Sequence, residues 1–370
     1  MNKQSMNRLF IFDARLRIAC LFLAFFGCMA GFYLFSQHLD PAAFIFRGTI
    51  FEGVSNGSIG YDGQFAYAIA SDPLGASRWL PEPAYRYQRI IYPLLVCLMS
   101  LGQPAVLPWA MILINLLALA ACGWLLADLL KERGASPWYS LVFLSFGGTL
   151  FVLLMDLNEP LTFLLVLLGV KFLDQKKFWL SGIAFAMGGL TKEVALVFAA
   201  AAAFWLVISC GNWRAALKVL GVSGLVFLVW GVVVSNWLPD TILRARMSRM
   251  EWIPFGGLFY IKDLPTLMID LCWIILPVLV LGMLAVLDFR KISPVPLETF
   301  FILANVLLIV FMPRFTWVDW IASLRLGMGL VIASLLYLAQ SHQRLGFYLY
   351  PFWSASIILP IAFIINIANT

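Results

Sequence analysis

The first stretch with residues suited to chemistry is 57–73, GSIGYDGQFAYAIASDP, in an otherwise strongly apolar chain. Asp62 lies there next to a glycine, where a hydroxyl group could approach with little steric obstruction, and a carboxylate so placed can act as a general base. Tyr61, Gln64 and Tyr67 surround it with the side chains that sugar sites use for stacking and hydrogen bonds. The simpler alternative is that Asp62 only interacts with the dipole of a helix that begins beside it.

A second stretch, 85–93, offers cations in the sequence YRYQRIIYP. Arg86 and Arg89 lie three residues apart and would share one face of a helix. The guanidinium fork matches phosphate oxygens, so this pair predicts a phosphate site, with Tyr92 as a further substrate contact. The alternative is that both arginines extend into anionic lipid headgroups.

Two short polar turns interrupt the apolar segments further along, DLNEP at 156–160 and LTKE at 190–193. Capping by Asn158 or Glu159 would explain one polar residue of the first turn, and the Lys-Glu pair of the second could neutralise itself at an interface. The turns hold more polar groups than capping needs. We therefore predict phosphate binding by Lys192 and substrate contacts by Asp156, Glu159 and Glu193.

Arg325 is the most deeply placed charge, about seven residues into an apolar segment, or ~10 Å by the helical rise. Ionisable groups at such depth are costly and indicate function. We predict that it binds a lipid phosphate; the alternative partner is Asp319. The chain has only two histidines and no phosphate-loop, dinucleotide-binding or zinc-protease motif.

The composition indicates the kind of fold that holds these residues. The chain is 62% apolar and 12% charged, whereas a soluble domain has about 25% charged residues. Apolar runs of about 20 residues recur along its length, which predicts an all-α, polytopic membrane bundle and a single membrane domain over 1–370. The net charge of +6 suits anionic lipid headgroups and does not indicate a nucleic-acid partner.

The apolar pattern predicts about eleven transmembrane helices. A shorter apolar piece, 90–101, is too short to cross and is expected to be interfacial or re-entrant, and an amphipathic helix is expected to begin at Asp62. The predicted spans are 16–36, 105–130, 138–155, 160–174, 178–190, 194–210, 216–236, 266–287, 297–313, 320–339 and 347–367.

The distribution of basic residues predicts the orientation. If 90–101 does not cross, most short loops rich in lysine and arginine fall on the side of the N-terminus, which the positive-inside rule makes cytoplasmic. The first long loop, 37–104, the second, 237–265, and both polar turns then share the extracytoplasmic face. We expect a multi-pass protein of a bacterial inner membrane with its active site on that face.

Four blocks carry a resemblance to a known family: YDGQ at 61–64, RYQRIIYP at 86–93, DLNEP at 156–160 and LTKE at 190–193. They resemble bacterial multi-pass proteins of cell-surface glycopolymer formation, which are similar to the C-type glycosyltransferase superfamily with its lipid-phosphate-mannose mannosyltransferases. The sequence departs from that pattern at Ala66, Asn158 and Lys192.

The resemblance implies a polyprenyl-phosphate sugar as donor and a carboxylate of the first outer loop as catalytic base, a role that falls on Asp62. The acceptor would be a cell-surface glycan, a lipid or a protein. Arg86, Arg89, Lys192 and Arg325 would stabilise the departing phosphate. Mg²⁺ or Mn²⁺ held by Asp62 with Asp156 or Glu159 could assist, but no metal ligand is assigned and no cofactor is required.

Two functions without catalysis compete with this one. A transporter or flippase of lipid-linked sugars would have the same charged vestibule, but it predicts inverted repeats and broken helices near the midplane. The sequence contains no such symmetry. A scaffold subunit of a polysaccharide-export complex would need none of the polar groups. An inverting glycosyltransferase remains the first prediction.

Overall fold

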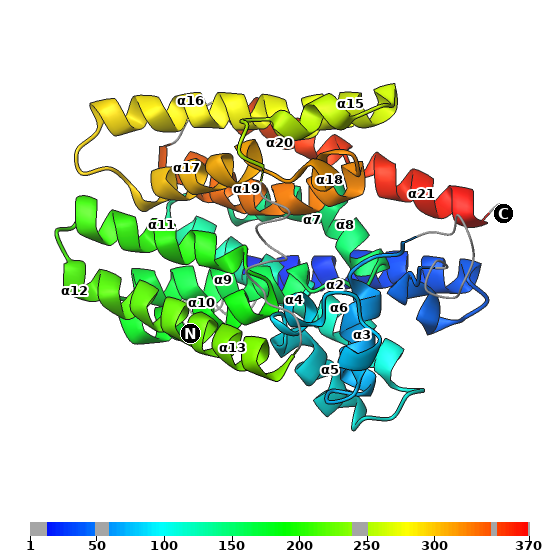
Figure 1. The fold of residues 1–370 in the computed structure, drawn as a ribbon. Helices are drawn as coiled ribbons and strands as arrows, with labels where there is room; N and C mark the ends of the chain where they lie inside the picture. The colour runs from blue at the N-terminus through cyan, green and yellow to red at the C-terminus, as the bar shows by residue number, and fades with distance from the viewer. Residues whose placement is uncertain (1–12, 49–58, 239–250, 342–345, 369–370) are drawn as a thin grey trace, which may run out of the picture.

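The computed structural model describes residues 13–48, 59–238, 251–341 and 346–368. These residues are mostly helical and contain no strand, only one isolated bridge between Arg47 and Gly60. The all-helical fold class is therefore confirmed. In Figure 1 the long helices run side by side across the view, and the short helices of the first long loop gather at one corner.

Among the described residues, six helical segments are long and apolar enough to cross a membrane, or seven if one bent pair counts as a single span. The bent pair comprises η4 (Pro137–Ser140) with α7 (Leu141–Ser145), and α8 (Gly147–Leu154), at 58° to them. The six are α2 (Ala14–Ser36), α6 (Leu107–Glu132), α12 (Trp213–Ala216) with η5 (Leu217–Gly221) and α13 (Val222–Trp237), α15 (Leu264–Asp270) with η7 (Leu271–Ile275) and α16 (Leu276–Lys291), α19 (Trp320–Ser341), and α20 (Gly346–Ala355) with α21 (Ile358–Ala368).

The prediction of about eleven spans is not confirmed, although helices occur at all the predicted places. Four of them have only 14 to 16 residues. At 1.5 Å per residue they are about 21–24 Å long, shorter than a ~30 Å hydrocarbon core. These are α9 (Glu159–Asp174), α10 (Phe178–Thr191), α11 (Ala195–Ile208) and α17 (Leu297–Val310).

The first long loop folds into short helices that bring its polar residues to the bundle. The segment 90–101 is present as α5 (Ile91–Ser100), whose ten residues are too few to cross. The others in this loop are η1 (Pro41–Ile45), α3 (Gly63–Ser71), η3 (Ala76–Arg78) and α4 (Pro83–Tyr87). The second predicted loop, 237–265, lies partly outside the described residues; η6 (Gly256–Tyr260) falls within it, and α18 (Arg314–Trp317) precedes α19.

A glycine fixes the start of α3 against the turn that precedes α9. A Cβ atom at Gly63 would lie 2.4 Å from the carbonyl oxygen of Met155 and 3.1 Å from that of Asp156. Neither backbone oxygen can move aside as a flexible side chain could, so only glycine permits this approach. Because Asp62 directly precedes Gly63, this contact also holds Asp62 close to the turn before α9.

The helices differ in how far the protein itself covers them. Most of the apolar part of α19 and α6 is buried, whereas α13 exposes Leu225, Leu228 and Val232. An apolar helix left uncovered in this way is stable in lipid, because its backbone groups are satisfied within the helix. The arrangement supports a multi-pass membrane protein with α6 and α19 at its centre.

Candidate active site

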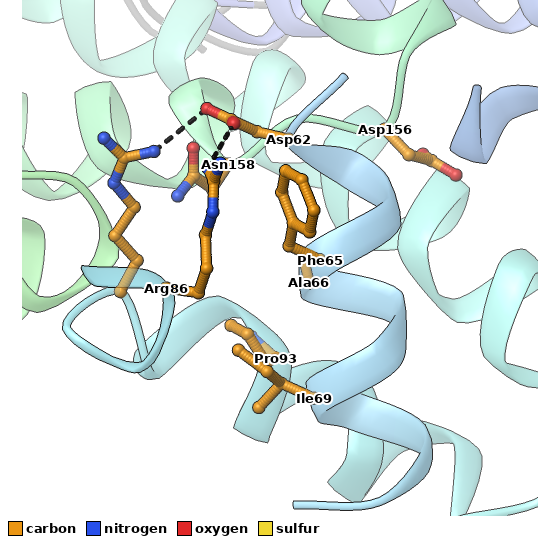
Figure 2. Close-up of a pocket in the computed structure, with 9 residues that line it drawn as sticks. Asp62, Phe65, Ala66, Ile69, Arg86, Pro93, Asp156 and Asn158 are labelled. Atoms are coloured by element: carbon orange, nitrogen blue, oxygen red, sulfur yellow. Dashed lines mark hydrogen bonds and ion pairs between the residues drawn. The ribbon is translucent and has the colours of Figure 1, made fainter. Parts of the chain in front are cut away.

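Asp62 is the centre of an ion-pair network at the start of α3. Its Oδ1 accepts a hydrogen bond from Nη1 of Arg86 and its Oδ2 one from Nη1 of Arg89, each at 2.9 Å. Figure 2 shows both contacts. Nη2 of Arg325 lies 3.6 Å from the same carboxylate. The side chain makes no capping hydrogen bond to α3, so the arginines, and not a cap, hold it.

The short helix α4 and the turn after it position the two arginines. Pro83 stands in the first turn of α4, where a missing N–H costs nothing, Arg86 lies in its last turn, and Arg89 follows two residues after the helix ends at Tyr87. Arg89 also donates to both carboxylate oxygens of Glu193, at 3.0 and 2.8 Å. Both arginines thus reach the Asp62 carboxylate, one from α4 and one from the turn after it, and phosphate binding by the pair stays a prediction.

The two polar turns meet in the other half of the network. Glu159, in the first turn of α9, accepts from Lys192 at 2.6 Å and lies 2.7 Å from Nη2 of Arg325. Its side chain is only 2% exposed. The alternative partner of Arg325, Asp319, instead accepts hydrogen bonds from the Tyr61 hydroxyl at 3.0 and 2.8 Å.

These contacts link seven charged residues into one unit, which we call the site cluster: Asp62, Arg86, Arg89, Glu159, Lys192, Glu193 and Arg325. Four of its members are cations and three are carboxylates, so the cluster carries one excess positive charge. Burial would raise the pKa of Asp62, but the positive charges of its neighbours, first Arg89 and then Arg86, outweigh burial and hold that pKa well below its usual range. Asp62 is thus ionised at neutral pH.

A small cavity of about 20 Å³ lies beside Asp62, large enough for a water molecule but not for a sugar ring. Three buried polar atoms of its lining residues have no hydrogen-bond partner among the described residues: Nε of Arg86, Oδ2 of Asp156 and Oδ1 of Asn158. Such atoms are rare in folded proteins and mark places where a ligand can supply the missing partner. The cavity is lined by Asp62, Phe65, Ala66, Ile69, Arg86, Arg89, Pro93, Asp156 and Asn158.

Asp156 belongs to this wall but not to the site cluster. Its side chain points away from Asp62 in Figure 2, towards Nδ2 of Asn115 at 3.4 Å, and that amide also donates to the Tyr92 hydroxyl at 3.0 Å. Asp156 lies in the turn between α8 and α9, and burial raises its pKa well above the usual range, which favours the neutral form of its carboxyl. It adds no charge to the seven.

The carboxylates proposed as metal ligands are engaged elsewhere. Asp62 and Glu159 contact cations, and the side chain of Asp156 points away from Asp62 (Figure 2). Within the described ranges, no group of three or more histidine, cysteine, aspartate or glutamate residues could hold a metal ion. The divalent ion therefore stays a prediction of the sequence.

The aromatic and amide residues around Asp62 have different surroundings. The Tyr61 ring lies 5.6 Å from the guanidinium carbon of Arg325, next to the cluster. Gln64 accepts from the Gly48 amide and donates to the Ile59 carbonyl, and thereby ties the first long loop together. Tyr67 faces Arg47. Sugar contacts by Gln64, Tyr67 and Tyr92 stay predictions.

Sequence reasoning missed two contributors. Tyr85 accepts from Nη2 of Arg89 at 2.6 Å, and its helical spacing of four from that arginine could have revealed it. Asn158 was considered only as a cap, yet its Nδ2 donates to the Thr191 carbonyl at 2.5 Å and ties the two polar turns together. That contact joins residues 33 positions apart and has no local signal.

The sequence profile of glycosyltransferase family 87 matches residues 90–313, more than half of the chain. The chain belongs to glycosyltransferase family 87. This is a C-type family of membrane glycosyltransferases, so the resemblance inferred from the four blocks is confirmed. No curated protein and no solved structure matches the chain. Of the site cluster of this family 87 member, Glu159, Lys192 and Glu193 fall inside the matched residues, and the other four members lie outside them.

Proposed function

We propose that this family 87 glycosyltransferase transfers a sugar from a polyprenyl-phosphate donor to a hydroxyl group of an extracytoplasmic acceptor, with inversion and with Asp62 as general base. The observation that carries the proposal is the site cluster, where one accessible carboxylate is surrounded by four cations. A base and a phosphate-binding group are the two parts that this reaction needs. The acceptor is a cell-surface glycan, a lipid or a protein.

The charge of the cluster matches the proposed donor. A polyprenyl-phosphate sugar is a phosphodiester with one negative charge, and the cluster has one excess positive charge. In the transfer, the acceptor oxygen bonds to the anomeric carbon while the bond from that carbon to the phosphate oxygen breaks and its electron pair stays on the phosphate. The acceptor proton passes to Asp62. The leaving phosphate then carries two negative charges and the cluster two positive ones, so the site stays neutral throughout.

The position of the cluster suits a donor anchored in lipid. The reactive carbon of such a donor lies at headgroup level, and Asp62, Glu159 and Lys192 lie at the ends of apolar helices. We place this end on the extracytoplasmic side of a bacterial cytoplasmic membrane. Cysteine labelling in intact cells should reach positions near 60, 158 and 192 from outside and positions near 133 and 176 only after permeabilisation. Labelling of 133 from outside would reverse the assigned faces.

The decisive experiment uses the purified protein in liposomes with radiolabelled undecaprenyl-phosphate mannose, and then with other sugars on the same lipid. Transfer predicts loss of label from the lipid fraction and its appearance in an acceptor, with no such change for Asp62→Asn. Movement of the intact labelled lipid to the other leaflet would indicate a flippase instead. Retention of label on the lipid with every sugar and acceptor would refute the proposed donor.

A further inference from the structure

The two arginines that contact Asp62 differ in how many of their hydrogen-bond donors are already used. Arg89 donates through Nη1 to Asp62, through Nε and Nη2 to Glu193, and through Nη2 to the Tyr85 hydroxyl. Each of its three nitrogens is engaged, and the residue is 8% exposed. A guanidinium with fixed partners on all sides has little capacity for another ligand.

Arg86 is held less completely. It donates through Nη1 to Asp62, and its Nε is buried without a partner among the described residues. Its guanidinium carbon lies 3.7 Å from the centre of the Phe65 ring, which fixes the plane of the group but uses none of its donors. Arg86 can therefore donate a hydrogen bond to a phosphate oxygen while Arg89 keeps its present contacts.

We propose that Glu193 is a positioning residue that holds Arg89 on Asp62, so that Arg89 orients the base and Arg86 receives the donor phosphate. The inference rests on the proposed function and deepens it. It divides the work of two arginines that are equivalent in the sequence pattern, and it gives Glu193 a role that needs no contact with substrate.

This division explains how Asp62 could become a base. When the phosphate draws Arg86 away, Oδ1 of Asp62 loses its hydrogen-bond donor and can take the acceptor proton. Oδ2 stays fixed by Arg89, which Glu193 grips with both oxygens in a bidentate pair. The carboxylate thus keeps its orientation while one oxygen is released for chemistry.

The test separates turnover from donor binding. Glu193→Gln keeps the shape of the side chain but loses one arm of the bidentate pair, so kcat should fall about 10- to 100-fold while the KM for undecaprenyl-phosphate mannose, or whichever donor the wild type uses, stays within about twofold. Arg86→Gln should raise that KM about 10-fold or more. Glu193→Asp, which keeps the charge, should recover part of the kcat. Glu132→Gln, a half-exposed acid far from Asp62, is the control and should change neither constant.

Binding of undecaprenyl phosphate alone gives a readout without catalysis. Its affinity should be unchanged in Glu193→Gln and weakened in Arg86→Gln. A KM increase of 10-fold or more in Glu193→Gln at unchanged kcat would overturn the inference, because Glu193 would then serve the phosphate site. If Glu193→Gln does not fold, Tyr85→Phe decides: a drop in kcat at constant KM supports the inference, and unchanged kcat overturns it. A wild type that neither binds this lipid nor transfers its sugar refutes the proposed function instead.

Discussion

Helix α9 has a charged network at each end, and the two are built differently. Glu159 at its start belongs to the site cluster. Lys171 and Asp174 at its end belong to two separate groups of ion pairs, about 20 Å away by the helical rise. We call these two groups together the distal cluster. It comprises Asp13, Arg15, Asp128, Glu132, Arg133, Lys171, Asp174 and Glu298.

The distal cluster has three cations and five carboxylates, so it carries two excess negative charges. Each cation forms ion pairs between two parts of the fold. Arg15 joins α2 to α6, Lys171 joins α9 to α6, and Arg133 pairs with both Asp174 and Glu298. No buried side-chain atom of these residues lacks a partner within the part of the chain that the structure describes. The site cluster has the opposite charge excess and keeps unpaired atoms beside a cavity. A larger cavity, of about 600 Å³, lies beside Glu132, Arg133, Asp174 and Glu298 of the distal cluster. The two clusters therefore differ in their charge excess and in their unpaired buried atoms, and not in the presence of a cavity.

One conservative substitution in each cluster should give the largest difference between them, a loss of transfer in the site cluster and a loss of stability in the distal cluster. Asp62→Asn keeps the shape of the side chain and removes its basicity, so transfer should drop at least ~100-fold in a protein that still folds and inserts into the membrane. Asp128→Asn, the matched variant in the distal cluster, weakens the contacts to Arg15 and Lys171 and should lower stability while kcat stays near the wild-type value. The measurements are radiolabel transfer and thermal unfolding. Near-normal transfer by a folded Asp62→Asn would move the base to Glu159.

In the site cluster, disturbing the backbone contact of Gly63 should reduce transfer almost as much as removing the base. Gly63→Ala introduces a Cβ 2.4 Å from the Met155 carbonyl oxygen, which must displace α3 and with it Asp62. We expect a 10- to 100-fold loss of transfer and a loss of stability of about 1–3 kcal/mol, typical of overpacking. Gly31→Ala is the control, because nothing lies within 4 Å of its added atom. Equal activity of the two variants would show that the start of α3 does not position the base.

The distal cluster should show its own largest effect in stability. Arg133 is buried, and replacing it by glutamine leaves Glu298 without a positive partner, which costs about 3 kcal/mol or more for a buried pair. Denaturation of Arg133→Gln in detergent should reveal this loss, while the donor KM of the surviving folded protein stays unchanged. A changed donor KM would mean that the two ends of α9 are coupled.

The sequence predicts well the features that depend on neighbouring residues alone, which are the positions of the helices and the identity of the charged residues. Helices occur at all the expected places because apolar runs demand them, and Asp62, Arg86 and Arg89 stood out because no topological role explained their charges. The count of eleven spans is not confirmed, because it included segments as short as 160–174 and 178–190, and the helices formed there and at α11 and α17 have only 14 to 16 residues.

The pairing of Arg89 with Glu193 could not be predicted, because it joins residues 104 positions apart. The same holds for the close approach of Gly63 to Met155. Each depends on how the first loop docks on the bundle, and no local pattern encodes that docking. The sequence therefore identifies the charged groups of the site more readily than their partners.

The smallest expected effect concerns pH. The cations that face Asp62, which are Arg89, Arg86, Arg325 and Lys192, hold its pKa well below the usual range, against the opposing effect of burial. A general base acts when ionised, so wild-type kcat/KM should show no acid limb from Asp62 above about pH 5.

Arg86→Gln removes one of these positive charges, which raises the pKa of Asp62 and moves the acid limb towards neutral pH. The distal variant Arg133→Gln should keep the wild-type profile, since its charge lies at the other end of α9. The check is kcat/KM measured from pH 8 down to the lowest pH at which each of the three proteins stays folded. If the profiles of Arg86→Gln and wild type superpose, Arg86 does not set the charge of Asp62; if Arg133→Gln shifts as well, the two clusters are not electrostatically independent.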